Sequence, residues 1–94
     1  MHEASLMRGL MANLEVIARD QQAKRIKRVR VWLGALSHFS VEHFREHFEQ
    51  ASKGTVAEKA TLDIAVSTDI ADPRAQDVVL ESLDVEVAGD AASH

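Results

Sequence analysis

The chain has 94 residues, of which 46% are hydrophobic and 28% charged, with a formal net charge of -4. This length suits one small domain with a single hydrophobic core, and the composition is typical of a folded globular protein. The lack of cysteine excludes disulfides, thiol chemistry and cysteine–zinc sites within these residues. The acidic balance argues against nucleic acid or anionic lipid as a partner, and no apolar stretch is long enough for a membrane span or a signal peptide. We therefore expect a cytoplasmic protein.

Residues 3–20 are predicted to form an amphipathic helix. Apolar residues recur at spacings of four, four and three, which places them on one helical face. This stripe consists of Leu6, Leu10, Leu14 and Ile17, flanked by Met7, Met11 and Ala18.

The next segment, "KRIKRVRVWLG", changes to a period of two, which predicts a strand with one buried face that ends at Gly34. Val29, Val31 and Leu33 fall on one face, and Arg28, Arg30 and Trp32 on the other. A second helix is expected to begin after Ser40 as its N-cap and to stop at Gly54. Its predicted core stripe is Val41, Phe44, Phe48 and Ala51.

Two further strands follow. In "ATLDIAVST", Leu62, Ile64 and Val66 alternate with more polar positions, and residues 69–77 then form a turn-rich connector that contains the only proline. In the last strand, "DVVLESLDVEV", the apolar positions change phase, which predicts a bulge near Glu81–Ser82. Residues 88–94 are expected to be a disordered tail.

The predicted order is αβαββ, which favours an α/β fold of the α+β type: a two-layer sandwich of two helices on a three-stranded mixed sheet. The first two strands are joined through a helix and are expected to be parallel, with a right-handed crossover. The last two strands are expected to form an antiparallel, hairpin-like pair. Residues 1–87 would then be one domain.

A basic run in the first strand has two interpretations. It could bind phosphate, or it could be the solvated face of the sheet. We favour the solvated face, because the last strand carries acidic residues that could pair with Arg28 and Arg30, namely Asp84 and Glu86. The run comprises Lys24, Arg25, Lys27, Arg28 and Arg30.

The stretch "HFREH" at residues 43–47 matches the H-x-x-E-H pattern of some zinc peptidases. His43 and His47 stand four residues apart on one helical face, with Glu46 between them. A peptidase also needs a third protein ligand and a substrate cleft, which so small a fold does not offer. Incidental metal binding by the two histidines, or a purely structural role, is the stronger expectation.

The first three residues can chelate a metal without a folded pocket. The amine of Met1, the amide nitrogen of His2 and the His2 imidazole close two adjacent chelate rings, and the Glu3 amide nitrogen can supply a fourth donor in the plane. A planar set of nitrogen donors suits Ni(II) or Cu(II). Because amide protons must be lost, binding should strengthen with pH.

Four segments together resemble the HypA/HybF family of nickel-insertion accessory proteins. They are "MHEASL", "RVRVWLGALS", "FEQASKGTVAEKATLDI" and "LESLDVEV", which extend from Met1 to about Val87 in the order of the family. The most specific of them are Met-His-Glu-x-Ser-Leu at the start and Lys-Gly-Thr-x-Ala-Glu at residues 53–58.

This resemblance implies a nickel metallochaperone for the maturation of [NiFe]-hydrogenase and, in some organisms, urease. It implies that His2, with the adjacent backbone nitrogens of Met1 and Glu3, holds Ni(II) as cargo. The implied partners are a nickel-related GTPase and the hydrogenase large subunit. The implied activity is binding and transfer, so the protein is not expected to be an enzyme.

One departure from the family is large. Members carry a zinc domain with two CxxC pairs, whereas here the corresponding interval is only residues 69–77 and has no cysteine. We therefore expect a short form that lacks this domain and binds no zinc. A short connector can also favour strand exchange, which makes a homodimer a further hypothesis. The alternative function is a metal-free interaction module of the same family that acts in hydrogenase assembly.

Overall fold

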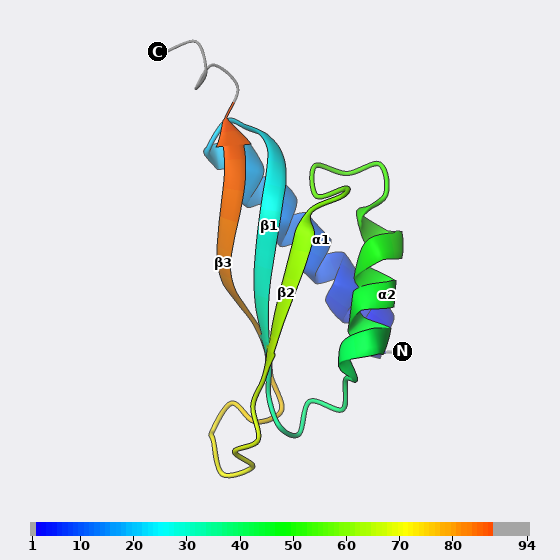
Figure 1. Ribbon diagram of the computed structural model, residues 1–94, viewed down its shortest axis with the longest axis vertical. Helices are drawn as coiled ribbons and strands as arrows, with labels where there is room; N and C mark the ends of the chain where they lie inside the picture. Colours follow the sequence, from blue (N-terminus) through cyan, green and yellow to red (C-terminus); the bar gives the residue numbers. More distant parts are fainter. Residues whose placement is uncertain (1, 88–94) are drawn as a thin grey trace.

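Two helices and three strands make up the fold (Figure 1). The structure is a computed structural model that describes residues 2–87, with side chains described from residue 4. The prediction for residues 88–94 lies outside the described residues. In chain order the elements are α1 (His2–Asp20), β1 (Ala23–Leu33), α2 (Val41–Ser52), β2 (Thr61–Val66) and β3 (Val78–Val87). The predicted order αβαββ is confirmed.

The strands lie in the order β2-β1-β3, with β1 parallel to β2 and antiparallel to β3. The parallel pair is as predicted, but the expected β2–β3 pair is wrong, since β1 lies between these two strands. Strand length gives the physical reason. β3 has ten residues and pairs along almost all of the eleven-residue β1, whereas β2 offers only six. The connector is long enough to carry the chain past β1 to this better partner.

The predicted bulge in β3 is confirmed. Arg30 pairs with Ser82 and Val31 with Leu80, so Glu81 is the extra residue. Two further irregularities, which were not predicted, lie in β1 between Ala23 and Arg25 and between Ile26 and Arg28. The second explains how Ile26 and Val29, three residues apart, both point into the core, since an extra residue resets the alternation of a strand.

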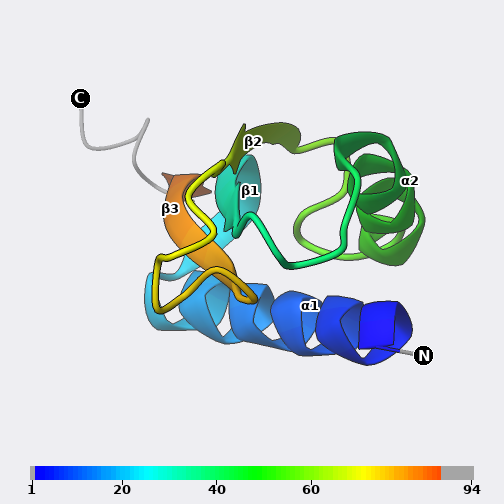
Figure 2. The same cartoon turned by 90° about the horizontal axis from the view of Figure 1, so that it is seen from below.

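Both helices contribute to one core on the same face of the sheet, and Figure 2 shows α1 running beneath the strands with α2 beside β2. The two-layer α+β architecture is therefore confirmed. The α1 stripe is rotated by about one residue from the prediction, because Met7 and Met11 are buried while Leu6 and Leu10 are only partly buried. The largest fully buried side chains are Phe44, Phe48, Leu14, Ile26, Leu33, Val29 and Val31.

The ends of α2 agree with the sequence. The Ser40 hydroxyl accepts a hydrogen bond from the backbone N–H of His43 at 3.1 Å, which confirms the N-cap. The helix ends at Ser52, and Gly54 follows with φ of 76°, a conformation that favours glycine. The inclusion of Val41 in the core stripe is wrong. It is 36% exposed, because it is the first residue of the helix and has no preceding turn to shield it.

Candidate metal centre

The predicted nickel ligands lie at the start of α1. Met1 is outside the described residues, and for His2 and Glu3 only the backbone, which begins the helix, is described. The first four N–H groups of an α-helix have no acceptor within the helix. The amide nitrogens of His2 and Glu3 are therefore not used by the helical hydrogen bonds, which is a requirement for the proposed chelate.

The rest of α1 is anchored in the core. Among the side chains described, Met7 is the first that is buried, and Leu14 has no exposed surface. The first turn therefore precedes the packed part of the helix and is held in place by it. In the described part of the chain, Leu6 is the first residue that packs against the core and Met7 is the first that is buried, so the backbone of residues 2 and 3 precedes the packed part of the helix.

The two flanks of α2 face different neighbours. Arg45 points to β2, where its Nη1 donates a hydrogen bond to the carbonyl oxygen of Leu62 at 2.9 Å. His43 and His47 lie on the other flank of the helix, and His43 is exposed while His47 is half-buried. In Figures 1 and 2 the N-terminal end of α1 lies alongside α2. The histidine flank is therefore the one turned away from β2.

The zinc-peptidase hypothesis for residues 43–47 gains no third ligand from the fold. Among the side chains described, from residue 4 to residue 87, no three His, Asp or Glu residues come together closely enough to hold a metal ion. His43 and His47 remain a pair of candidate ligands, separated by one turn of the helix.

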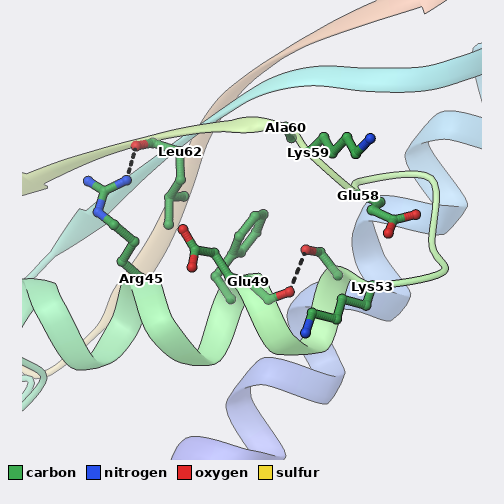
Figure 3. Close-up of a pocket in the computed structure, with 9 residues that line it drawn as sticks. Arg45, Glu49, Lys53, Glu58, Lys59, Ala60 and Leu62 are labelled. Atoms are coloured by element: carbon green, nitrogen blue, oxygen red, sulfur yellow. Dashed lines mark hydrogen bonds between the residues drawn. The ribbon is translucent and has the colours of Figure 1, made fainter.

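A groove of about 450 Å³ lies between α2 and β2 (Figure 3). Phe48 and Leu62 supply apolar surface, while charged residues of both signs lie around it. Three of its lining residues, Lys53, Glu58 and Lys59, belong to or adjoin the Lys-Gly-Thr-x-Ala-Glu segment. Hydrophobic periodicity gave no indication of this groove, because it depends on how the loop after α2 folds back toward β2.

The open face of the sheet carries ion pairs, as predicted, but with different partners. Arg28 pairs with Asp63 of β2 at 3.2 Å and Arg30 with Glu81 at 3.3 Å, rather than with Asp84 and Glu86. Glu86 pairs with Arg25 at 2.6 Å. The hydrogen bond and positive charge of Arg25 lower the pKa of the Glu86 carboxyl. The strand register places Arg25 opposite Glu86, which accounts for that pair, whereas Arg28 lies opposite Asp84 and pairs with Asp63 of β2 instead.

Arg74 of the connector lies over the Trp32 ring, 4.9 Å from its centroid. Within the basic run, Arg25, Arg28 and Arg30 make ion pairs with acidic residues of β2 and β3, which supports the solvated-face interpretation. No helix within residues 2–87 is long and apolar enough to cross a bilayer.

Most of the chain matches a known protein family. Residues 1–72 match the family model described as "Hydrogenase/urease nickel incorporation, metallochaperone, hypA". The chain belongs to the HypA family. The match includes Met1, His2 and Glu3 and all elements except β3.

Curated relatives agree. The hydrogenase maturation factors HypA of Methylocella silvestris and Archaeoglobus fulgidus are each 41% identical to the chain over 66 residues, or 70% of its length. These matches cover 58% and 60% of the two relatives. The chain thus spans somewhat less than two thirds of the relatives' length.

Solved structures show a similar fold over most of the chain. The solution structure of the nickel metallochaperone HypA from Helicobacter pylori has a TM-score of 0.76 at 23% identity and covers 90% of this chain and 97% of its own. A second solution structure of a HypA protein has a TM-score of 0.72 at 24% identity and covers 90% and 96%. The α+β fold is therefore that of HypA structures.

Proposed function

We propose that this protein binds Ni(II) through Met1, His2 and Glu3 and transfers it during the maturation of [NiFe]-hydrogenase, with urease as an alternative client. The observation that carries the proposal is the family match, which begins at the first residue and includes the Met-His-Glu motif. Membership of a metallochaperone family also favours binding and transfer over catalysis.

The chemistry of the donor set supports nickel as the cargo. The Met1 amine, the two amide nitrogens and the His2 imidazole together offer four nitrogen donors, an arrangement that suits square-planar Ni(II). The start of α1 at His2 leaves both amides without helical acceptors. Residues 1–87 would form the nickel-binding domain, with no zinc required, because the sequence contains no cysteine.

The proposed setting is the cytoplasm, and the proposed partners are a nickel-related GTPase and the hydrogenase large subunit. Family membership supports these partners, which would receive or help to release the metal. The competing hypothesis is a metal-free module that only docks to them.

Titration with Ni(II), followed by absorption spectroscopy, tests the proposal. We expect a square-planar Ni(II) spectrum that strengthens with rising pH, because metal must displace the amide protons. His2→Ala and acetylation of the Met1 amine should each abolish it. His94→Ala is the matched control, because it removes an imidazole at the other end of the sequence, and it should leave the spectrum unchanged.

A planar spectrum that survives in His2→Ala contradicts the proposed ligands. Absence of any planar species in the wild-type chain, together with GTPase binding that His2→Ala does not change, favours the metal-free module.

A further inference from the structure

The histidine pair on α2 has a geometry that the nickel proposal does not use. His43 and His47 are four residues apart within one regular helix. Side chains at this spacing project from the same face, with Cβ atoms about 5–6 Å apart, so two imidazoles can reach one metal ion. Imidazole is a good ligand for nickel, copper and zinc.

The helix that carries the pair is held firmly. Ser40 caps its first turn by accepting from the N–H of His43, and Phe44 and Phe48 are almost completely buried. Phe44 also makes an edge-to-face contact with Phe39, with ring centroids 5.8 Å apart. The backbone at His43 and His47 is therefore fixed before a metal binds, which lowers the entropic cost of bringing the two ligands together.

The surroundings of the pair also favour a cation. Glu42 and Glu46, both exposed, lie on the same helix, whereas the one basic residue of the helix, Arg45, is engaged with Leu62 on the opposite flank. The pair lies on the flank of α2 away from β2, and the N-terminal end of α1 lies alongside the same helix (Figures 1 and 2).

We propose that His43 and His47 form a second binding site for a borderline divalent transition-metal ion, independent of His2. Two protein nitrogens leave the other positions of the ion to water, which gives six-coordinate Ni(II) rather than the planar species. Such an ion is held more loosely than in a four-nitrogen chelate. The site could collect nickel and pass it to the N-terminal ligands. This role rests on the proposed function, but the existence of the site does not.

Nickel titration of the full chain in the His2→Ala background isolates the second site. We expect this variant to lack the planar spectrum and still to bind Ni(II) with the weak absorption of a six-coordinate ion. Adding His43→Ala or His47→Ala should weaken the remaining affinity by tenfold or more. His38→Asn in the same background is the matched control. It removes another exposed imidazole and keeps a residue that tolerates the φ of 65° at this position, so it should have no effect.

Circular dichroism of each variant verifies that the helices are retained. A second measurement needs no further substitution: in the His2→Ala chain, Ni(II) bound at this site should broaden the imidazole NMR signals of His43 and His47. Two results overturn the proposal: no nickel binding in His2→Ala, or binding there that is insensitive to His43→Ala and His47→Ala. Failure of the proposed function has a different signature, since it removes the planar species from the wild-type chain and leaves the six-coordinate site in place.

Discussion

The face of the sheet covered by the helices and the face that carries the arginines are built from the same strands but held by different interactions. Val29, Val31 and Leu33 of β1 have no exposed surface on the covered face. On the open face, the side chains of Arg28 and Arg30 are 55% and 56% exposed even though each makes an ion pair. One strand therefore contributes both to a dry core and to a hydrated set of charges.

The difference shows where the stability of the fold resides. Burial of a large apolar side chain contributes about 1.5–3 kcal/mol, whereas an exposed ion pair contributes about 0–1 kcal/mol. The covered face should therefore determine whether the protein folds. The open face contributes mainly solubility and a preference for one strand register.

The largest effect on stability is expected from Phe44→Ala, which removes a fully buried aromatic ring from the core on the covered face. Loss of the ring and the cavity left behind should lower the free energy of unfolding by about 3–5 kcal/mol, measured by urea denaturation. Val16→Ala is the control, because Val16 is 48% exposed on α1 and should change stability little. Equal losses in the two variants would show that the covered face is not the main source of stability.

A smaller effect is expected from Ser40→Ala, which acts on the covering helix without changing the core. Loss of the hydrogen bond from the His43 N–H to the Ser40 hydroxyl should cost about 1 kcal/mol. Ser40→Asp preserves an N-cap acceptor and should remain close to wild type in thermal denaturation. If Ser40→Asp were as unstable as Ser40→Ala, the loss could not be assigned to the cap.

The smallest effect is expected on the open face, from Glu86→Gln. The pKa of Glu86 is lower in the folded protein, so its pair with Arg25 stabilises the fold above the carboxyl's unfolded-state pKa. This contribution is lost as the pH falls through the folded-state pKa. The difference in melting temperature between wild type and Glu86→Gln should be small at neutral pH and should disappear in acid or in high salt. Glu58→Gln serves as the control, and a difference that persists at low pH would contradict the assignment to this pair.

Much of the covered face could be predicted from the sequence, because burial of one face of a helix or strand imposes a regular spacing on its apolar residues. Val29, Val31, Leu33, Phe44 and the bulge at Glu81 all follow from the spacing of apolar residues. The order of the strands in the sheet could not be predicted in this way, since the local spacing of apolar residues does not determine which edge of β1 a later strand pairs with. A sign of the second β1 bulge was nevertheless present in the three-residue interval from Ile26 to Val29, which strict alternation does not allow.

The candidate metal centre was likewise predictable only in part from the sequence. The motif Met1-His2-Glu3 was found by its donor chemistry and by the family resemblance, and the fold adds only where the helix begins. The placement of His43 and His47 on the flank of α2 away from β2 required the structure, because it depends on Arg45 contacting the carbonyl oxygen of Leu62. Arg45 belongs to no periodic pattern that would have indicated this contact.

The connector between β2 and β3 divides into an anchored half and a free tip. The backbone N–H of Gly34 donates to Asp77 and that of Leu36 to Ala75, while Ile70 is 70% exposed. A cut near Ile70 would leave β3 attached through its ladder with β1 and through these two bonds. The segment from Ala71 onward should therefore work as a separate complementing fragment, and a reporter fused at the cut could follow the assembly of the two pieces in solution.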